Sequence, residues 1–297
     1  MSPNHTTVSR RHPSMISRAV RGIIRRCKEL RNTIEWSAVH AVRREAPWSR
    51  NRWGQRYQAV SLSEYHYLRD GNPETYESAL IERTIRPGMT IVDVGANHGM
   101  FSLEAAHFIG GKGVIHAFEP TPSTRNLLLN NLAINNLAAV KVFPSAVGEA
   151  LGTARLRVHR EMSGLNTLAD QEITWNRKPL SADEIIEVAI TTLDAHAEAE
   201  GLDQIDFLKI DVEGFELGVI RGARGLLREK RVARIMLEVG DVTCDNAGIA
   251  PMEVLDELWS LGYQLHEISP NGEIADCIQA FPSSTFSANF FAVPAKG

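Results

Sequence analysis

Five short apolar segments, four of them followed by a helical pattern, constrain the fold of this chain more than any other feature. They lie at 90–94, 114–118, 140–143, 206–210 and 233–237. Strand-length apolar runs that alternate with helices are typical of βαβ units, in which right-handed crossovers join parallel strands. The sequence therefore predicts an α/β protein with a doubly wound, Rossmann-like parallel sheet.

Residues 149–192 interrupt this alternation. Within them, 154–158 and 187–191 alternate with period two, which predicts two paired strands flanking an irregular stretch. The final apolar runs, 263–268 and 289–293, are expected to close the sheet. We therefore predict three parts: a basic arm (1–56), a helical adaptor (57–89) and a cofactor-binding domain (90–297) that carries a β insertion at 149–192.

The charge of the chain is divided unequally between the arm and the rest. Residues 1–56 hold 13 Lys and Arg against 3 Asp and Glu, whereas the whole chain holds 32 against 36. Apolar residues recur every three or four positions between 14 and 45, which predicts an amphipathic helix. Self-association and binding to an anionic membrane surface are both open for this helix. Nucleic-acid binding is disfavoured, because the arm lacks interleaved aromatic residues.

Cysteine content and hydropathy indicate the compartment. The three cysteines are scattered and form no CxxC pair, which argues against a disulfide framework and against a cysteine-based zinc site. No apolar run reaches the roughly 18–20 residues that a membrane span needs. We expect a cytoplasmic protein, with peripheral membrane contact as the open alternative.

A glycine-containing loop follows the first strand, and an acidic residue ends the second. The loop is Asp93-Val94-Gly95-Ala96-Asn97-His98-Gly99, and the acidic residue is Glu119. In open α/β sheets, ligands bind beyond the carboxyl ends of the strands. A carboxylate there can accept two hydrogen bonds from vicinal ribose hydroxyls, so these residues predict an adenosine-containing cofactor.

The charge of the loop separates two such cofactors. A dinucleotide fingerprint has a second glycine two residues after the first, close to an anionic pyrophosphate. Here that position is Asn97, and Asp93 stands at the strand end. S-adenosylmethionine has no phosphate and carries a cationic sulfonium, which suits this environment better.

Three carboxylates follow the fourth strand. They are Asp211, Glu213 and Glu216, all within six residues. Mutual repulsion among carboxylates raises the pKa of at least one of them, which suits a general base. For Glu216, attraction to a helix N-terminus is an equally good explanation.

These motifs together resemble the FkbM-type S-adenosylmethionine-dependent methyltransferases of the class I superfamily. The matching residues are the loop 93–99, Phe118-Glu119-Pro120, Thr192-Leu193-Asp194, the run 209–216, and Tyr76-Glu77 upstream. The resemblance covers about Tyr76 to Val293 and leaves the basic arm outside it. It implies a seven-stranded sheet with a reversed last strand, and methyl transfer to a hydroxyl oxygen of a sugar, glycolipid or polyketide-like natural product.

The resemblance also implies roles for individual residues. Asp93, Gly95, Asn97 and Gly99 would line the methionine part of the cofactor. Glu119 would hold the ribose, and Asp211 and Glu213 would face the methyl group. The full set of predicted cofactor-binding residues is Glu77, Asp93, Gly95, Ala96, Asn97, Gly99, Glu119, Pro120, Ser145, Ala146 and Asp211.

A hydroxyl acceptor needs a base within about 2.6–3.2 Å of its proton. Asp211 and Glu213 are the candidates, with Glu238 at the fifth strand as an alternative. The same three carboxylates are oxygen ligands of the kind that magnesium or calcium prefers, although we assign no metal-binding residue. A dinucleotide oxidoreductase and a non-catalytic binding module are the competing interpretations.

Overall fold

The computed structural model describes residues 48–58, 76–160, 162–169, 172–175, 178–269, 271–281 and 287–295. The amphipathic helix predicted at 14–45 lies outside these residues. In the described part of the chain, no helix is both long enough and apolar enough to cross a membrane.

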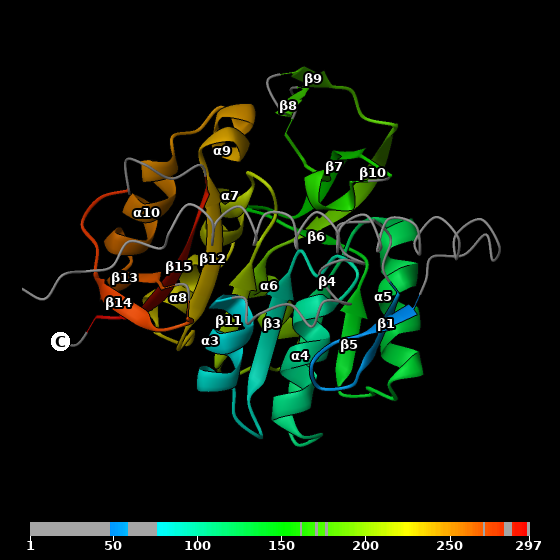
Figure 1. Cartoon of the computed structure of the whole chain (residues 1–297). Helices are drawn as coiled ribbons and strands as arrows, with labels where there is room; N and C mark the ends of the chain where they lie inside the picture. Colours follow the sequence, from blue (N-terminus) through cyan, green and yellow to red (C-terminus); the bar gives the residue numbers. More distant parts are fainter. Residues whose placement is uncertain are drawn as a thin grey trace, which may run out of the picture.

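A mixed sheet forms the centre of the molecule (Figure 1). Its strands are β3 (Thr90–Val94), β4 (Val114–Phe118), β5 (Val140–Phe143), β11 (Phe207–Ile210), β12 (Ile235–Gly240), β13 (Tyr263–Ile268), β14 (Ile274–Cys277) and β15 (Ser287–Pro294). Their order is β14-β13-β15-β12-β11-β3-β4-β5. The ladders from β5 to β12 are parallel, and β15 runs antiparallel to β12 and β13.

This topology confirms the predicted α/β class and the reversed last strand. The predicted number of seven strands is wrong for this sheet, which has eight. The additional strand is β14, which pairs antiparallel with β13 at the edge. It has only four residues, which are all exposed and do not alternate between apolar and polar, so no strand pattern marks it in the sequence.

Helices cover both faces of the sheet. One face packs against α3 (Tyr76–Thr84), α4 (Met100–Ile109) and α5 (Pro122–Ile134). The other packs against α6 (Leu193–Glu200), α7 (Glu216–Arg221), α8 (Arg224–Arg228) and α10 (Pro251–Ser260), while α9 (Asp241–Ala247) follows β12. Because successive strand side chains point to opposite faces, Ile91 enters the first core and Val92 the second. Both faces are therefore apolar, as parallel sheets require.

The helical pattern after the fourth apolar segment predicts a single helix from Phe215 to Leu227, but the structure divides it into α7 and α8. The interruption lies at Gly222, where a Cβ would come within 1.9 Å of the Gly148 carbonyl oxygen. The chain after β6 thus passes too close for any side chain at this position, and α8 begins two residues later, at Arg224. Residues 193–200, for which we predicted no element, form α6 between an N-capping Thr192 and a left-handed Gly201.

The insertion forms a separate small β unit above the sheet in Figure 1. Its strands are β7 (Gly152–Val158), β8 (Ile173–Trp175), β9 (Lys178–Leu180) and β10 (Glu184–Thr191), with the short 3₁₀ helix η1 (Ser163–Leu165), and β6 (Ala146–Val147), just before the insertion, pairs with β10. The predicted pairing of the two alternating segments is confirmed, because β7 and β10 are antiparallel partners. Leu156, Val158 and Val188 form an apolar cluster of their own with Ala146.

A hairpin at 48–58 belongs to the body of the molecule rather than to the arm. It consists of β1 (Trp48–Arg50) and β2 (Arg56–Gln58). The backbone amides of Arg56 and Gln58 donate to the side chains of Asn135 and Asn131 on α5, at 2.7 and 2.9 Å. The boundary predicted between residues 56 and 57 therefore falls inside β2.

Candidate cofactor and catalytic site

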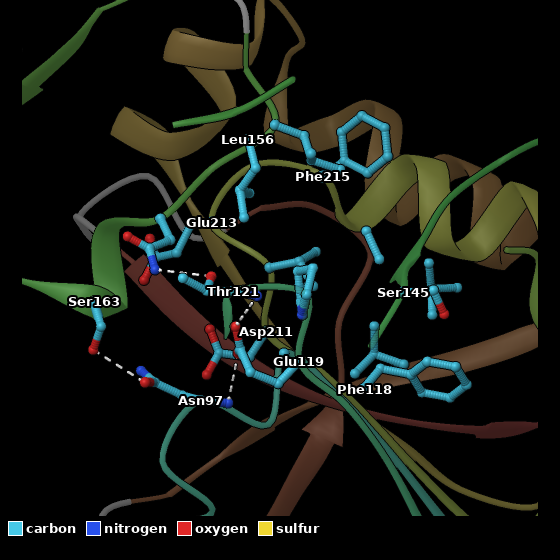
Figure 2. Close-up of a pocket in the computed structure, with 18 of the residues that line it drawn as sticks. Asn97, Phe118, Glu119, Thr121, Ser145, Leu156, Ser163, Asp211, Glu213 and Phe215 are labelled. Atoms are coloured by element: carbon cyan, nitrogen blue, oxygen red, sulfur yellow. Dashed lines mark hydrogen bonds between the residues drawn. The ribbon is translucent and has the colours of Figure 1, made fainter. Parts of the chain in front are cut away.

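Two adjoining cavities lie at the carboxyl ends of β3, β4 and β11. The one called here the larger cavity spans about 660 Å³, part of it open to solvent, and reaches from the glycine loop to Ser145 and the insertion (Figure 2). The smaller, about 590 Å³, lies on the α3 and α4 side. Gly95, Asn97 and Asp211 line both cavities. An elongated ligand could therefore pass from one cavity to the other at these three residues.

The glycine loop needs its first glycine for two reasons. Gly95 has a φ of 82°, in the left-handed region that favours glycine. A Cβ at this position would also lie 1.8 Å from the backbone oxygen of Asp211. The absence of a side chain therefore lets the loop after β3 pack directly on the end of β11, which brings Asn97 and Asp211 to the same place.

Two backbone amides hold the carboxylate of Glu119. Thr121 N donates to Oε1 at 2.8 Å, and Asn97 N donates to Oε2 at 3.0 Å. Burial raises the pKa of Glu119 above its ordinary value, and the hydrogen bonds from Thr121 and Asn97 oppose that shift. Each carboxylate oxygen keeps acceptor capacity, so an ionised Glu119 can accept two more hydrogen bonds from a ligand in the larger cavity.

The acidic cluster lies where the two cavities meet. Asp211 lines both cavities, and Glu213 lines the larger one. Burial, followed by the charges of Asp211 and Glu238, raises the pKa of Glu213 well above its ordinary value. Burial also raises the pKa of Glu216 to about 7. Its Oε1 accepts hydrogen bonds from the backbone amides of Gly214 and Val212, so Glu216 stabilises the turn between β11 and α7.

Lys209 is the cation beneath this cluster. Its Nζ lies 2.8 Å from Asp211 Oδ2 and 3.8 Å from Asp93 Oδ1. Burial alone would lower the pKa of Lys209, but Asp211 and Asp93 outweigh it and hold that pKa above its ordinary value. Lys209 lines the smaller cavity, which sequence reasoning did not anticipate, because a lysine inside a strand motif gives no sign of where its head group lies.

Two further carboxyls lie in the smaller cavity. Burial raises the pKa of Glu77 to about 7, and burial likewise raises that of Glu104 to about 7. Glu104 accepts a hydrogen bond from the hydroxyl of Ser78 at 2.7 Å. Glu77, on α3, lines this cavity together with Asp211 and Lys209, whose charges act on it, and its role in cofactor binding stays a prediction.

The structure brings together ten of the thirteen predicted site residues. The ten that line one or both cavities are Glu77, Gly95, Ala96, Asn97, Glu119, Pro120, Ser145, Ala146, Asp211 and Glu213. Asp93, Gly99 and Glu238 line neither of the two.

Asp93 and Gly99, which are predicted to line the cofactor, make other contacts in the structure. Asp93 is fully buried. It accepts a hydrogen bond from Ser102 Oγ of α4 at 2.6 Å, so it faces the side of the sheet that α4 covers. Gly99 begins α4 with a φ of 91° and packs against Leu128. Asp93 and Gly99 thus support the glycine loop through contacts outside the two cavities. Glu238 is near enough to Glu213 to raise its pKa, but lies outside the cavity wall.

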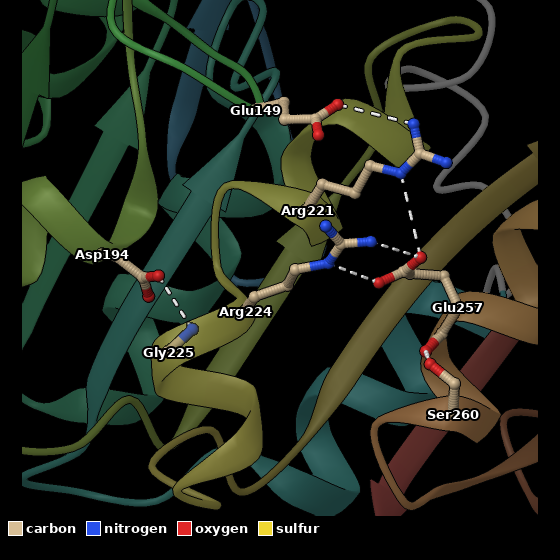
Figure 3. Close-up of polar contacts among 7 residues, drawn as sticks. All are labelled: Glu149, Asp194, Arg221, Arg224, Gly225, Glu257 and Ser260. Carbon is tan, nitrogen blue, oxygen red and sulfur yellow. Dashed lines mark hydrogen bonds and ion pairs between the residues drawn. The ribbon is translucent and has the colours of Figure 1, made fainter.

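One motif of the resemblance is structural. Thr192 caps α6 by accepting from the Ala195 amide at 3.1 Å. Asp194 accepts from the amides of Gly225 and Leu226, at 2.8 and 2.9 Å, and so caps α8 (Figure 3). The Thr192-Leu193-Asp194 motif therefore joins two helices and does not reach the cavities.

The insertion forms one wall of the larger cavity, and the sequence predicts only part of this arrangement. Leu156, Ser163, Gly164, Asn166 and Leu168 line the larger cavity. The small polar residues at 163–167 predict a cover, but nothing in the sequence predicts which loops they would contact. Among the residues that the structure describes, no three His, Cys, Asp or Glu side chains are arranged to hold a metal ion.

Comparison with known sequences identifies one family. The model of the methyltransferase FkbM domain matches residues 93–265. Methyltransferase sdnD of Sordaria araneosa is 34% identical over 44% of this chain, and Methyltransferase 1 of Beauveria bassiana is 30% identical over 44%. The chain spans 59% and 57% of the length of these two relatives. The 31-O-demethyl-FK506 methyltransferase FkbM of Streptomyces tacrolimicus is 31% identical over 53% of this chain and 68% of its own length.

Comparison with solved structures finds methyltransferases at low sequence identity. A SAM-dependent O-methyltransferase from Thermotoga maritima is 14% identical, with a TM-score of 0.40 over 74% of this chain and 65% of that chain. Fibrillarin from Aeropyrum pernix is 13% identical, with a TM-score of 0.41 over 73% of this chain and 76% of that chain.

Proposed function

The chain belongs to the FkbM methyltransferase family, and we propose that it transfers the methyl group of S-adenosylmethionine to a hydroxyl oxygen of a small-molecule acceptor. A sugar, a glycolipid or a natural product is the acceptor class that we propose. The observation that carries the proposal is the pair of cavities that meet at Gly95, Asn97 and Asp211, with a held carboxylate in one and acidic side chains in the other.

The larger cavity suits the adenosine part of this cofactor. Glu119 would accept hydrogen bonds from the ribose hydroxyls, and Ser145 and Ala146 would lie beside the adenine edge. Three carboxylates line this cavity, whereas none of its described lining residues is Lys, Arg or His. An anionic pyrophosphate would be repelled there, which supports S-adenosylmethionine over a dinucleotide.

The smaller cavity suits the amino-acid part. Glu77 and Asp211 are acceptors for an ammonium group, and Lys209 keeps the cavity from being uniformly negative. With adenosine in one cavity and the amino acid in the other, the sulfonium would lie near the residues that both cavities share. When bound there, the cofactor would supply an electrophilic methyl carbon on a cationic sulfur.

The protein would contribute alignment and a base. Asp211 and Glu213 are close enough to the junction for either to take the acceptor's proton as its oxygen bonds to the methyl carbon. The raised pKa of Glu213 suits this role, because a carboxylate with an ordinary pKa is a weak base near neutral pH. The proton would end on the carboxylate, and the electron pair of the broken carbon–sulfur bond would leave with the thioether.

Two variants test the base. Asp211→Asn and Glu213→Gln are each expected to lower kcat by about 100-fold or more if the substituted group is the base. Methyl transfer would be measured with labelled donor against a panel of sugar, glycolipid and natural-product acceptors. Calorimetry with S-adenosylhomocysteine should show binding by both variants. Full activity in both would contradict the base assignment.

The cofactor itself is tested separately by titrating the unaltered chain with S-adenosylhomocysteine and with NAD. Binding of the former alone is expected. Absence of S-adenosylhomocysteine binding at millimolar concentration would contradict the proposal, and NAD binding alone would favour an oxidoreductase. Binding of S-adenosylhomocysteine without transfer to any acceptor of the panel would favour a non-catalytic binding module.

A further inference from the structure

Residues 163–167 of the insertion, here called the cap segment, form one side of the larger cavity, where Ser163 faces Asn97 (Figure 2). Their polar side chains contact three different loops. Ser163 Oγ donates to Asn97 Oδ1 at 3.0 Å, and Asn166 Nδ2 donates to Thr121 Oγ1 at 3.2 Å. Thr167 Oγ1 donates to the backbone oxygen of Glu213 at 2.8 Å. The cap segment is thus joined to the loops after β3, β4 and β11.

Two of these contacts converge on one carboxylate. Asn97 and Thr121, which Ser163 and Asn166 contact through their side chains, are the two residues whose backbone amides hold Glu119. The hydroxyl of Thr121 also hydrogen-bonds Glu119. Each oxygen of the carboxylate is therefore connected to the cap segment through a single intervening residue.

Of Asn97 and Thr121, Asn97 depends more on its contact with the cap segment. Its φ is 49°, a left-handed conformation that costs a non-glycine residue free energy and persists only where neighbours hold it. The ring of His98 adds a second contact, because its Nε2 lies 3.1 Å from Ser163 Oγ. Loss of the Ser163 hydroxyl would free the Asn97 side chain and loosen the amide that holds Glu119 Oε2.

We propose that Ser163 and Asn166 are positioning residues for Glu119, which set its carboxylate to receive the ribose hydroxyls of the cofactor. This inference rests on the proposed function, because it requires an adenosyl ligand. The insertion would then contribute to cofactor recognition through the strand-end loops.

Ser163→Ala gives the cleanest test. Ser163 Oγ contacts only the loop after β3 among the described residues, whereas Asn166 Oδ1 also accepts from the His159 amide within the insertion. We would measure the affinity of S-adenosylhomocysteine and of its 2′-deoxy and 3′-deoxy analogues by calorimetry. The unaltered chain should prefer the parent ligand by about 10-fold or more, because each missing hydroxyl leaves a carboxylate acceptor without a donor.

The measured quantity is the ratio of affinities between parent and deoxy ligands. Glu119→Gln should reduce this ratio, because it removes the charge of the group that accepts hydrogen bonds from the ribose hydroxyls. Ser163→Ala should reduce it by about 3- to 10-fold, and Asn166→Ala should act in the same direction. A variant that merely weakens packing would lower all three affinities equally and leave the ratio unchanged.

Ser181→Ala is the matched control. It makes the same substitution in the same insertion and removes a 2.8 Å hydrogen bond to Glu172, but it does not reach the cavity. It should keep the affinities and the ratio of the unaltered chain. Thermal denaturation of each variant verifies that it is folded, and Ser163→Ala alone suffices if Asn166→Ala does not fold.

The outcomes separate the two proposals. No binding of S-adenosylhomocysteine by the unaltered chain would overturn the proposed function and this inference together. Binding with a ratio that Ser163→Ala leaves unchanged would overturn only the inference. Binding without any preference for the ribose hydroxyls would also overturn it, because Glu119 would then have no ribose contact to be positioned for.

Discussion

Asp93 and Lys209 are register partners on neighbouring strands, and their charges meet inside the helix-covered face of the sheet. Oδ1 of Asp93 is buried and has no hydrogen-bond partner among the described residues, so Lys209 is the charge that compensates it. Removing one member of a buried pair leaves the other charge unpaired in a poorly solvating environment. The pair should therefore matter to stability more than to ligand contact.

Lys209→Met is expected to lower the free energy of unfolding by about 3–5 kcal/mol, because Asp93 then lacks a cation. Adding Asp93→Asn to that variant should recover part of the loss. Urea unfolding of both single variants and the double variant gives the interaction energy. Losses that simply add would show that the two charges are not coupled.

Gly95→Ala should destabilise the chain by about 3 kcal/mol, because the new methyl group meets backbone that cannot rotate away and the residue keeps a left-handed φ. Gly152→Ala on β7 is the control, since a Cβ there meets nothing within 4 Å and its φ is not left-handed. Thermal and urea unfolding of both variants would measure the difference. Equal stability of the two would contradict the close approach between Gly95 and Asp211.

Sequence reasoning found the cavity-lining residues that follow strand ends, such as Asn97, Glu119 and Asp211. It placed Asp93 near a strand end, but could not show that this side chain is fully buried beside Ser102 and Lys209. It did not find Thr121 or Leu156, which reach the cavity through tertiary packing. The sequence therefore predicts where a residue lies along a strand. It does not predict the surroundings of that residue's side chain, because these depend on the helices that cover each face.

Helix α8 depends on a residue 31 positions away for its first turn. Asp194 accepts from the amides of Gly225 and Leu226, and nearby Arg224 forms a two-point pair with Glu257 of α10 at 2.7 and 3.0 Å (Figure 3). Arg221 of α7 approaches the same Glu257 carboxylate at 3.8 Å and Glu149 at 3.5 Å. These contacts fasten α6, α7, α8 and α10 together on one face of the sheet.

Asp194→Ala is expected to lower the free energy of unfolding by about 1–2 kcal/mol, because two amides at the start of α8 lose their acceptor. The affinity for S-adenosylhomocysteine should not change, since Asp194 lines neither cavity. Asp194→Asn, which keeps one acceptor oxygen, should lose less stability. A fall in ligand affinity without a fall in stability would contradict the structural role.

The elements recognised from sequence are those with strong periodicity, such as β3, β4, β11 and α10. In α10, Pro251 stands in the first turn and Glu253 accepts from the Ala250 amide, while Val254, Leu255 and Leu258 are buried. Short elements such as β8 and β9 carry too few residues for a period to show. The break between α7 and α8 lies at Gly222, beside the Gly148 backbone, and no local sequence pattern reveals this contact.

Across the whole molecule, several buried carboxyls have raised pKa values. For Glu104 the folded value is about 7, mainly because of burial. A carboxyl whose folded pKa is raised contributes stability that is present below its unfolded pKa and lost as pH rises through the folded one. A lowered pKa has the opposite effect on how stability changes with pH. Burial lowers the pKa of His116 to about 4, for example. A single substitution is therefore needed to isolate one group.

Glu104→Gln removes one of these carboxyls without changing its shape. The free energy of unfolding of the unaltered chain, relative to the variant, should fall by about 2–3 kcal/mol between pH 5 and pH 8. Urea unfolding at several pH values measures this difference, and Glu187→Gln on the exposed side of β10 is the matched control. A difference that rises with pH would contradict the sign derived from the burial of Glu104.

The antiparallel strand β15 has a consequence for how this protein is made. It is the last strand in the described chain, yet it lies between β12 and β13 in the interior of the sheet. During synthesis, β12 and β13 emerge from the ribosome with no neighbour on the sides that β15 will occupy. The sheet is completed only after β15 has been translated, so a nascent chain stalled before residue 287 would present two exposed edges to other chains or to chaperones.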